Sequence, residues 1–198
     1  MTTTDVRQPG ALERALVILG VLIAALWVIE IVDSIAFEDG LERHGIRPRA
    51  WSGLDGVVWA PFLHGTFGHL ISNTVPLLIL GGLVMTSGAV RWLQVTAIVA
   101  LVGGLLTWLF AFSGDSVHIG ASGVIFGYIG YLLASAFFER SFRAVVLAVI
   151  VGVIYGGGLI VGFLPRPGIS WEGHLFGFLA GVAAAWAFGR RGASASEI

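Results

Sequence analysis

The sequence contains no cysteine, no lysine and few charged residues of either sign. Without cysteine the chain has no disulfide, no thiolate metal site and no cysteine nucleophile. Only 12% of the 198 residues are charged and 57% are hydrophobic, so the chain is far more apolar than an ordinary soluble domain. All eleven cationic residues are arginine and the net charge is -1, so nothing indicates a nucleic-acid partner. The composition predicts an integral membrane protein of one domain.

The sequence also lacks a pattern for metal chemistry. The His-Glu-x-x-His motif of helical zinc proteases does not occur. The five histidines have no carboxylates beside them at ligand spacing, which argues against a two-metal site. We therefore expect neither a metal nor a cofactor.

What the sequence does contain is a series of long apolar runs. A helix needs roughly 17–25 such residues to cross a bilayer. Six runs come near this length, at 12–32, 68–87, 92–112, 122–138, 143–164 and 173–189. They predict an all-α polytopic membrane protein whose six-helix core spans 12–189. A flexible cytoplasmic N-terminus at 1–11, a long first loop at 33–63 and a cytoplasmic tail at 190–198 complete the expected organisation.

The arginines predict the orientation. With the N-terminus inside, seven arginines fall in inner segments and four in outer segments. Because cytoplasmic loops carry the excess of positive charge, both termini are expected inside. The second, fourth and sixth runs then cross from outside to inside.

A serine among small residues begins the fourth run, in Gly120-Ala-Ser-Gly123. Such a serine is open to approach by a substrate. The alternative interpretation is a contact between helices, because membrane helices use Gly, Ala and Ser to pack closely.

Three other polar side chains lie near the starts of runs that cross in the same direction. His69 and Asn73 are four residues apart, so they share one helix face at the start of the second run. His174 lies at the start of the sixth. All would sit at a similar shallow depth with Ser122, and this convergence predicts a single site.

Glycines next to Ser122 and His174 favour their contact. They recur every four residues, at Gly123 and Gly127 in the fourth run and at Gly173, Gly177 and Gly181 in the sixth. Two such faces let helices approach closely. A hydrogen bond between the two side chains requires that approach, since it spans only about 2.6–3.2 Å.

These residue types predict a serine hydrolase with a Ser–His dyad. Ser122 would be the nucleophile, and His174 the general base and then the acid to the leaving amine. The backbone N–H of Ser122 and the side chains of His69 and Asn73 would donate to the oxyanion.

Three further residues are expected to have supporting roles or none in catalysis. Phe126, one turn after Ser122, would stack on the imidazole or else belong to the core. Asp115 lies in an outer loop and is expected to be solvated rather than a third catalytic member. His64 and His69 are five apart and would diverge on a regular helix, so His64 is read as a buried residue tying the first loop to the bundle.

Three motifs in this order resemble the bacterial rhomboid intramembrane serine proteases: His-x4-His-x3-Asn at 64–73, Gly-Ala-Ser-Gly at 120–123 and Gly-His-x2-Gly-x3-Gly at 173–181. The resemblance implies a six-helix core in the bacterial plasma membrane. It implies cleavage of single-span transmembrane proteins near the outer face of the bilayer. The residues it implies are the dyad Ser122 and His174, the oxyanion or substrate-binding residues His69, Asn73 and Gly120, and the supporting residues His64, Gly123, Phe126 and Gly177.

Three positions depart from that pattern. Asp55-Gly56 stands where family members often carry Trp-Arg in the first loop, Met85 stands in place of a Glu, and Phe126 in place of a Tyr. The first two bear on loop anchoring and stability rather than on the catalytic residues.

Some alternatives remain open at this level. Gly156-Gly-Gly158 in the fifth run indicates either close helix packing or a hinge for lateral opening. A catalytically silent relative that binds transmembrane clients, or a small transporter, would fit the same hydropathy. The transporter predicts polar residues near mid-span rather than at one depth.

Overall fold

The computed structural model describes residues 10–112 and 116–195. Every regular element within them is helical, apart from one antiparallel bridge between Ile46 and His118. The elements are α1 (Ala11–Val32), η1 (Asp33–Phe37), η2 (Gly40–His44), η3 (Trp51–Gly53), α2 (Gly56–Trp59), η4 (Ala60–Phe62), α3 (Phe67–Met85), α4 (Ala89–Ile98), η5 (Val99–Gly103), α5 (Gly104–Phe110), α6 (Ser122–Phe138), α7 (Phe142–Gly162) and α8 (Trp171–Ala195).

Each of the six predicted apolar runs coincides with a helix or a continuous helical rod. Four are long and apolar enough to cross a bilayer: Glu13–Phe37 with 25 residues, Phe67–Met85 with 19, Ala89–Phe110 with 22 and Phe142–Gly162 with 21. α6 is shorter, at 17 residues, and α8 begins with the polar residues Glu172 and His174. The chain is therefore an all-α, multi-pass membrane protein.

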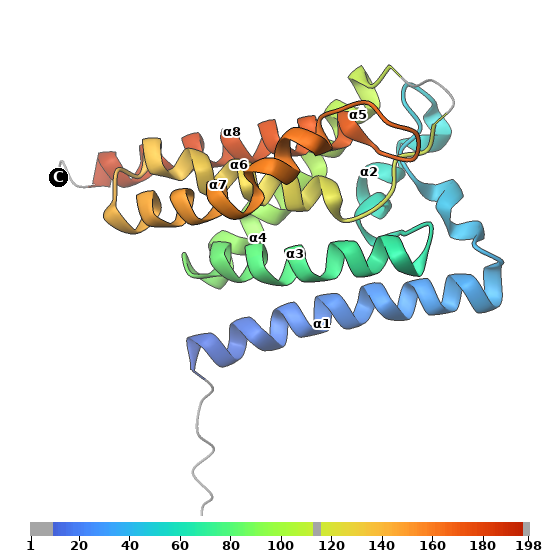
Figure 1. Cartoon of the computed structure of the whole chain (residues 1–198), viewed down its shortest axis with the longest axis horizontal. Coiled ribbons are helices and arrows are strands. Elements are labelled where there is room, and N and C mark those ends of the chain that lie inside the picture. The colour runs from blue at the N-terminus through green and yellow to red at the C-terminus, as the bar shows by residue number, and fades with distance from the viewer. Residues whose placement is uncertain (1–9, 113–115, 196–198) are drawn as a thin grey trace, which may run out of the picture.

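α6 lies at the centre of the bundle. It packs against α8 and α7 on one side and against α3 on the other, and α1 covers the far side of α3 (Figure 1). Its residues are buried without a break from Val124 to Leu132. A helix that is apolar all round is expected in such a position, because no face of it must meet water.

The contact between α6 and α8 depends on missing side chains. A Cβ on Gly177 would collide with the carbonyl of Gly123, and one on Gly181 would collide with the carbonyl of Gly127. In the other direction, a Cβ on Gly130 would meet the carbonyl of Phe178. The predicted close approach of the two glycine faces is thus confirmed at Gly177 and Gly181.

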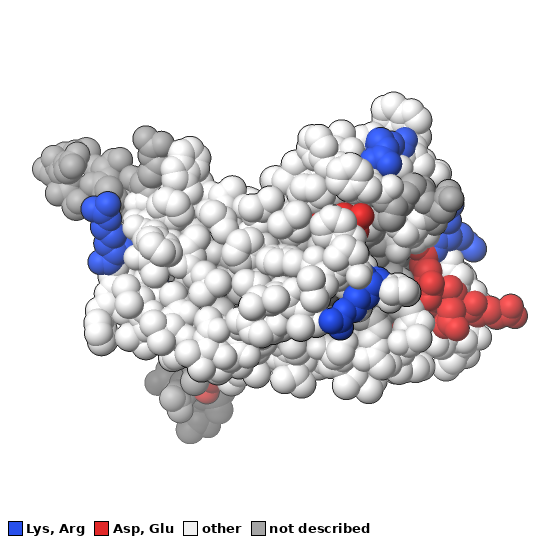
Figure 2. Space-filling view, turned by 45° about the horizontal axis from the view of Figure 1, so that its top comes forward, with Lys and Arg blue, Asp and Glu red and all other residues white. Residues whose placement is uncertain are grey.

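The two ends of the core lie together. α1 begins and α8 ends at the same end of the molecule (Figure 1). Charged side chains gather toward the two ends, and a broad belt without charge separates them (Figure 2).

Both expected terminal segments extend beyond the described part. Residues 1–9 of the predicted flexible N-terminus lie outside the described residues, as do residues 196–198 of the predicted tail. The tail was expected to begin at 190, but α8 continues to Ala195. The sequence Arg-Arg-Gly-Ala-Ser-Ala contains no proline to stop the helix there.

The first loop is anchored by close backbone contacts. A Cβ on Gly56 would overlap the backbone of Gly45 and Ile46, so only glycine fits at this position. The backbone of Ile46 exchanges two hydrogen bonds with His118, at 3.0 and 2.9 Å. Asp55 contacts His44 at 3.1 Å. Asp55 and Gly56, where the sequence departs from the family pattern, therefore both make contacts that hold the loop in place.

Arg49 supplies an anchor that the sequence did not reveal. Its backbone N–H donates to the carbonyl of Trp108, and its Nη1 donates to the carbonyl of Ala111, just after α5. A cation is stabilised at a helix C-terminus, where the last carbonyls lack partners.

At the other end of the bundle, Met85 is buried in the apolar core.

Candidate active site

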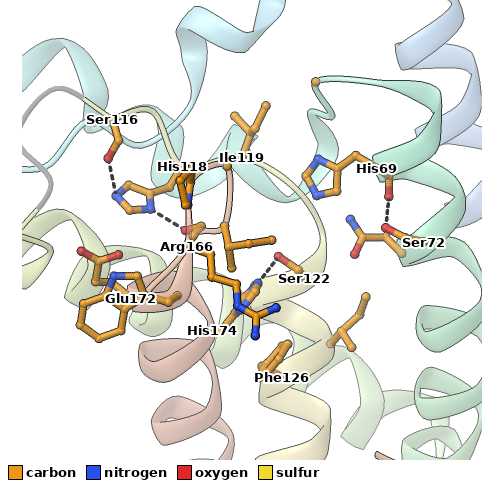
Figure 3. A pocket seen from close by; sticks show the side chains of 18 of the residues that line it. His69, Ser72, Ser116, His118, Ile119, Ser122, Phe126, Arg166, Glu172 and His174 are labelled. Carbon is orange, nitrogen blue, oxygen red and sulfur yellow. Dashed lines mark hydrogen bonds between the residues drawn. The ribbon is translucent and has the colours of Figure 1, made fainter. Parts of the chain in front are cut away.

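Ser122 and His174 lie within hydrogen-bond distance of each other. Ser122 Oγ and His174 Nε2 are 2.9 Å apart, although 52 residues separate them in the chain. Ser122 is the first residue of α6, and His174 lies in the first turn of α8 (Figure 3). The glycine contact between these helices brings the two side chains together.

A backbone carbonyl orients His174. Its Nδ1 lies 2.8 Å from the carbonyl oxygen of Gly162, at the end of α7. A carbonyl can only accept, so Nδ1 carries the proton and the neutral ring leaves Nε2 free to accept from Ser122. Gly162 is a functional position that no sequence motif marks, because its contribution is a carbonyl group.

Phe126 holds the imidazole ring from one face. The two rings are stacked, with centroids 4.1 Å apart and planes 1° from parallel. A Cβ on Gly162 would collide with the Phe126 ring, so this glycine makes room for the stack. Of the two interpretations of Phe126, the structure shows the stack.

On the other side of Ser122, Gly120 lies against His69 and Asn73. Its φ of +106° is a conformation that side chains rarely adopt, and a Cβ there would be 2.6 Å from the His69 ring. Its N–H donates to the carbonyl of Ala60 at 2.8 Å. Asn73 Nδ2 is buried and has no hydrogen-bond partner among the described residues. The site thus holds a spare donor beside residues 118–121, the nucleophile loop, which precedes the candidate nucleophile Ser122.

These residues open onto a cavity of about 1180 Å³. α3, the start of α6, α7 and the segment between α7 and α8 line it. The lining includes Tyr155 of α7 and Arg166, which is labelled in Figure 3. Gly158 also lines it. A Cβ on any of Gly156, Gly157 or Gly158 would meet nothing within 4 Å, so close packing does not explain this triplet.

Comparison with known sequences identifies the family of this chain. Residues 50–191 match the profile of the Rhomboid domain. The chain belongs to the rhomboid family. Its relatives include an uncharacterized protein of Mycobacterium bovis, 40% identical over 193 residues that cover 93% of this chain and 79% of the relative. RHOMBOID-like protein 5 of Arabidopsis thaliana is 34% identical over 152 residues, which cover 74% of this chain and 45% of the relative.

In this rhomboid, His64 lies beside His69, contrary to the expectation that the two would diverge. Their ring centroids are 5.0 Å apart, in an edge-on arrangement. The prediction was wrong because α3 begins only at Phe67, so helical spacing does not apply to His64. The Ala121 N–H donates to His64 Nε2 over a long 3.5 Å, which ties the residue to the nucleophile loop.

The buried position of His64 predicts a pH effect on stability. Burial, together with the nearby His69, lowers the pKa of His64 to about 4. Between pH 6.5 and 4 the unfolded chain binds a proton at this site that the folded chain does not. Stability is therefore full above about pH 6.5 and falls as the pH drops toward 4, by about 3 kcal/mol for this residue.

Unfolding measurements in detergent between pH 7 and 4 check this expectation. His64→Gln should show a flatter pH dependence than the wild type, by up to one proton. The two proteins differ only at residue 64, so the difference between their curves isolates the contribution of His64. Parallel curves for the two proteins would contradict the assignment.

The sequence raises Asp115 as a third catalytic member and a metal site as an alternative, and favours neither. Asp115 lies outside the described residues. Across residues 10–112 and 116–195, no group of three or more His, Asp or Glu side chains is arranged to hold a metal ion.

Proposed function

We propose that this rhomboid is an intramembrane serine endopeptidase that cleaves transmembrane proteins near the outer face of a bacterial plasma membrane. One observation carries the proposal: Ser122 Oγ contacts the unprotonated nitrogen of a histidine whose other nitrogen is held by a carbonyl. This is the arrangement that activates a serine hydroxyl as a nucleophile.

The chemistry follows the roles of the two residues. Ser122 Oγ attacks the peptide carbonyl while His174 Nε2 takes its proton. The tetrahedral intermediate then collapses, and His174 returns the proton to the leaving amine. Water then attacks the acyl-enzyme while His174 Nε2 takes its proton. The second tetrahedral intermediate collapses, His174 returns the proton to Ser122 Oγ, and the new carboxyl group is released. The Gly162 carbonyl and the face of Phe126 stabilise the imidazolium in place of a carboxylate.

The oxyanion would be held by donors on the side of Ser122 opposite His174. The N–H groups in the first turn of α6 have no partner within the helix, and the helix dipole favours negative charge there. Asn73 Nδ2 and the His69 ring, both next to Gly120, add side-chain donors. Gly120 allows this approach because it has no side chain.

Six crossings with both termini inside would place the site at a shallow depth. The site residues belong to the first turns of α6 and α8 and to the first two turns of α3. The cavity lies between α3 and α7, and a single-span substrate helix in the bilayer would enter there. The small residue before the cleaved bond, which the family resemblance implies, suits a backbone that must pass close to Gly120.

Purified protein incubated with a panel of single-span transmembrane substrates tests the function, with Ser122→Ala as the control. The wild type should cleave a substrate and react with a fluorophosphonate, and Ser122→Ala should do neither. Cleavage retained in full by Ser122→Ala would disprove the mechanism. Binding of transmembrane clients without labelling would instead favour a silent relative.

Asn73→Ala should lower kcat about 10-fold to 1,000-fold, because one of several oxyanion donors is lost. KM should change little, since the donor acts mainly in the transition state. Asn73→Asp keeps the size of the side chain but puts a carboxylate near the oxyanion, so it should lose at least as much. Steady-state cleavage of one substrate by the three proteins checks this. An active Asn73→Asp would contradict the oxyanion role.

A further inference from the structure

A second hydrogen-bonded pair joins the same two segments as the catalytic pair. His118 Nδ1 and Ser170 Oγ share a hydrogen bond of 2.5 Å. His118 is only 5% exposed, and its backbone is held on both sides by the bridge to Ile46. Both side chains line the same cavity as Ser122 and His174. Figure 3 shows His118 in its wall.

The two pairs have the same spacing in the chain. His118 lies four residues before Ser122, and Ser170 lies four residues before His174, so each pair spans 52 residues. The Ser170 carbonyl also accepts the His174 N–H at 3.0 Å, which links Ser170 directly to the backbone of the base. A shift of Ser170 relative to His118 would therefore displace His174 as well.

Gly173 leaves the space that this pair occupies. A Cβ on Gly173 would lie 2.6 Å from Ser170 Oγ. Gly177 and Gly181, by contrast, are required by the backbone of α6. The first glycine of the predicted strip thus has a different role from the other two.

We propose that His118 and Ser170 are positioning residues that hold the nucleophile loop and the start of α8 at the separation that Ser122 and His174 require. The inference rests on the proposed protease function. Glycine faces bring α6 and α8 together, but they have no side chains to resist a slide of one helix along the other. A directional hydrogen bond at the active end supplies that restraint.

The expected effect is on the chemical step. A displacement of about 1 Å between catalytic groups can cost about 100-fold in rate. Ser170→Ala and His118→Leu should therefore each lower kcat by about 10-fold to 100-fold, with KM within about twofold of the wild type. The rate of Ser122 labelling by a fluorophosphonate should fall in parallel. His118→Asn can keep a hydrogen bond to Ser170 and should recover most of the activity.

The same measurements include a matched control and a double mutant. Ser135→Ala removes another buried hydroxyl of α6, one that donates to the Tyr131 carbonyl at 2.8 Å away from the site, and should leave kcat unchanged. Because His118 and Ser170 act through one bond, the double variant His118→Leu/Ser170→Ala should be no slower than the worse single variant. A double variant whose loss of kcat equals the product of the two single losses would overturn the proposal that the two residues act as a pair.

The cleavage rate of each variant is divided by the amount of Ser122 that the fluorophosphonate finally labels. A smaller fraction of folded protein is then not mistaken for a slower chemical step. Normal rates per site in Ser170→Ala and His118→Leu, beside an active wild type, would overturn the inference and leave the protease function standing. A wild type that neither labels nor cleaves would overturn both. Failure of His118→Asn to recover activity would show that the hydrogen bond is not what His118 provides.

Discussion

Cleavage by His174→Ala is expected to fall by at least about 1,000-fold in kcat, close to the loss in Ser122→Ala. Nucleophile and base act as a unit, so removing either removes nearly all covalent catalysis. His174 is also the only base that the structure places at Ser122 among the described residues, at 2.9 Å. Steady-state cleavage of a transmembrane substrate and the rate of fluorophosphonate labelling both measure the loss.

His174→Asn separates the loss of the base from the loss of structure. Asparagine keeps a donor near the position of Nδ1, so it can still hydrogen-bond the Gly162 carbonyl, but it offers no nitrogen base at the position of Nε2. It should be as inactive as His174→Ala while its thermal unfolding stays near that of the wild type. His44→Ala removes a first-loop histidine whose partner is Asp55, and it should retain activity. Substantial cleavage by His174→Asn would show that the base lies elsewhere.

Gly177→Ala is expected to destabilise the protein by about 3 kcal/mol and to lower activity as well. The added methyl group would collide with the Gly123 carbonyl, and backbone at both sides must move to admit it. Because α6 and α8 carry Ser122 and His174, separating them also lengthens the catalytic contact. Thermal unfolding and kcat, measured on the same preparation, check both effects.

Gly157→Ala is the matched control in the same bundle. A Cβ at Gly157 would meet nothing within 4 Å, so the same substitution creates no overlap there. Its stability should stay within about 1 kcal/mol of the wild type, and the better helix propensity of alanine favours a small gain. Equal unfolding temperatures for the Gly177 and Gly157 variants would contradict the close contact between α6 and α8.

Several features could be predicted from the sequence because they depend on neighbouring residues alone. The six apolar runs coincide with helices since the length of a hydrophobic run is a local property. The glycine faces of α6 and α8 were visible as a four-residue period, and that period indicated which helices approach closely. The convergence of His69, Asn73, Ser122 and His174 on one cavity was expected from the direction in which alternate runs would cross.

Other features could not be predicted because they depend on backbone groups or on irregular segments. The Gly162 carbonyl that orients His174 leaves no mark in the sequence. His64 was expected to diverge from His69 on a regular helix, but α3 begins only at Phe67. The departure at Asp55-Gly56 suggested a weakly held loop, whereas Gly56 lies against Gly45 and Ile46.

The sequence by itself thus determined that this chain is a multi-pass helical membrane protein with a serine and a histidine on glycine-lined helices. The tertiary structure decided how Ser122 and His174 are oriented, by Gly162 and Phe126, and which second pair ties their segments together. The physical reason is the range of the interactions. The tendency of a helix to enter a bilayer depends only on the residues within that helix. A hydrogen bond of 2.9 Å between residues 52 positions apart depends on the packing of the whole bundle.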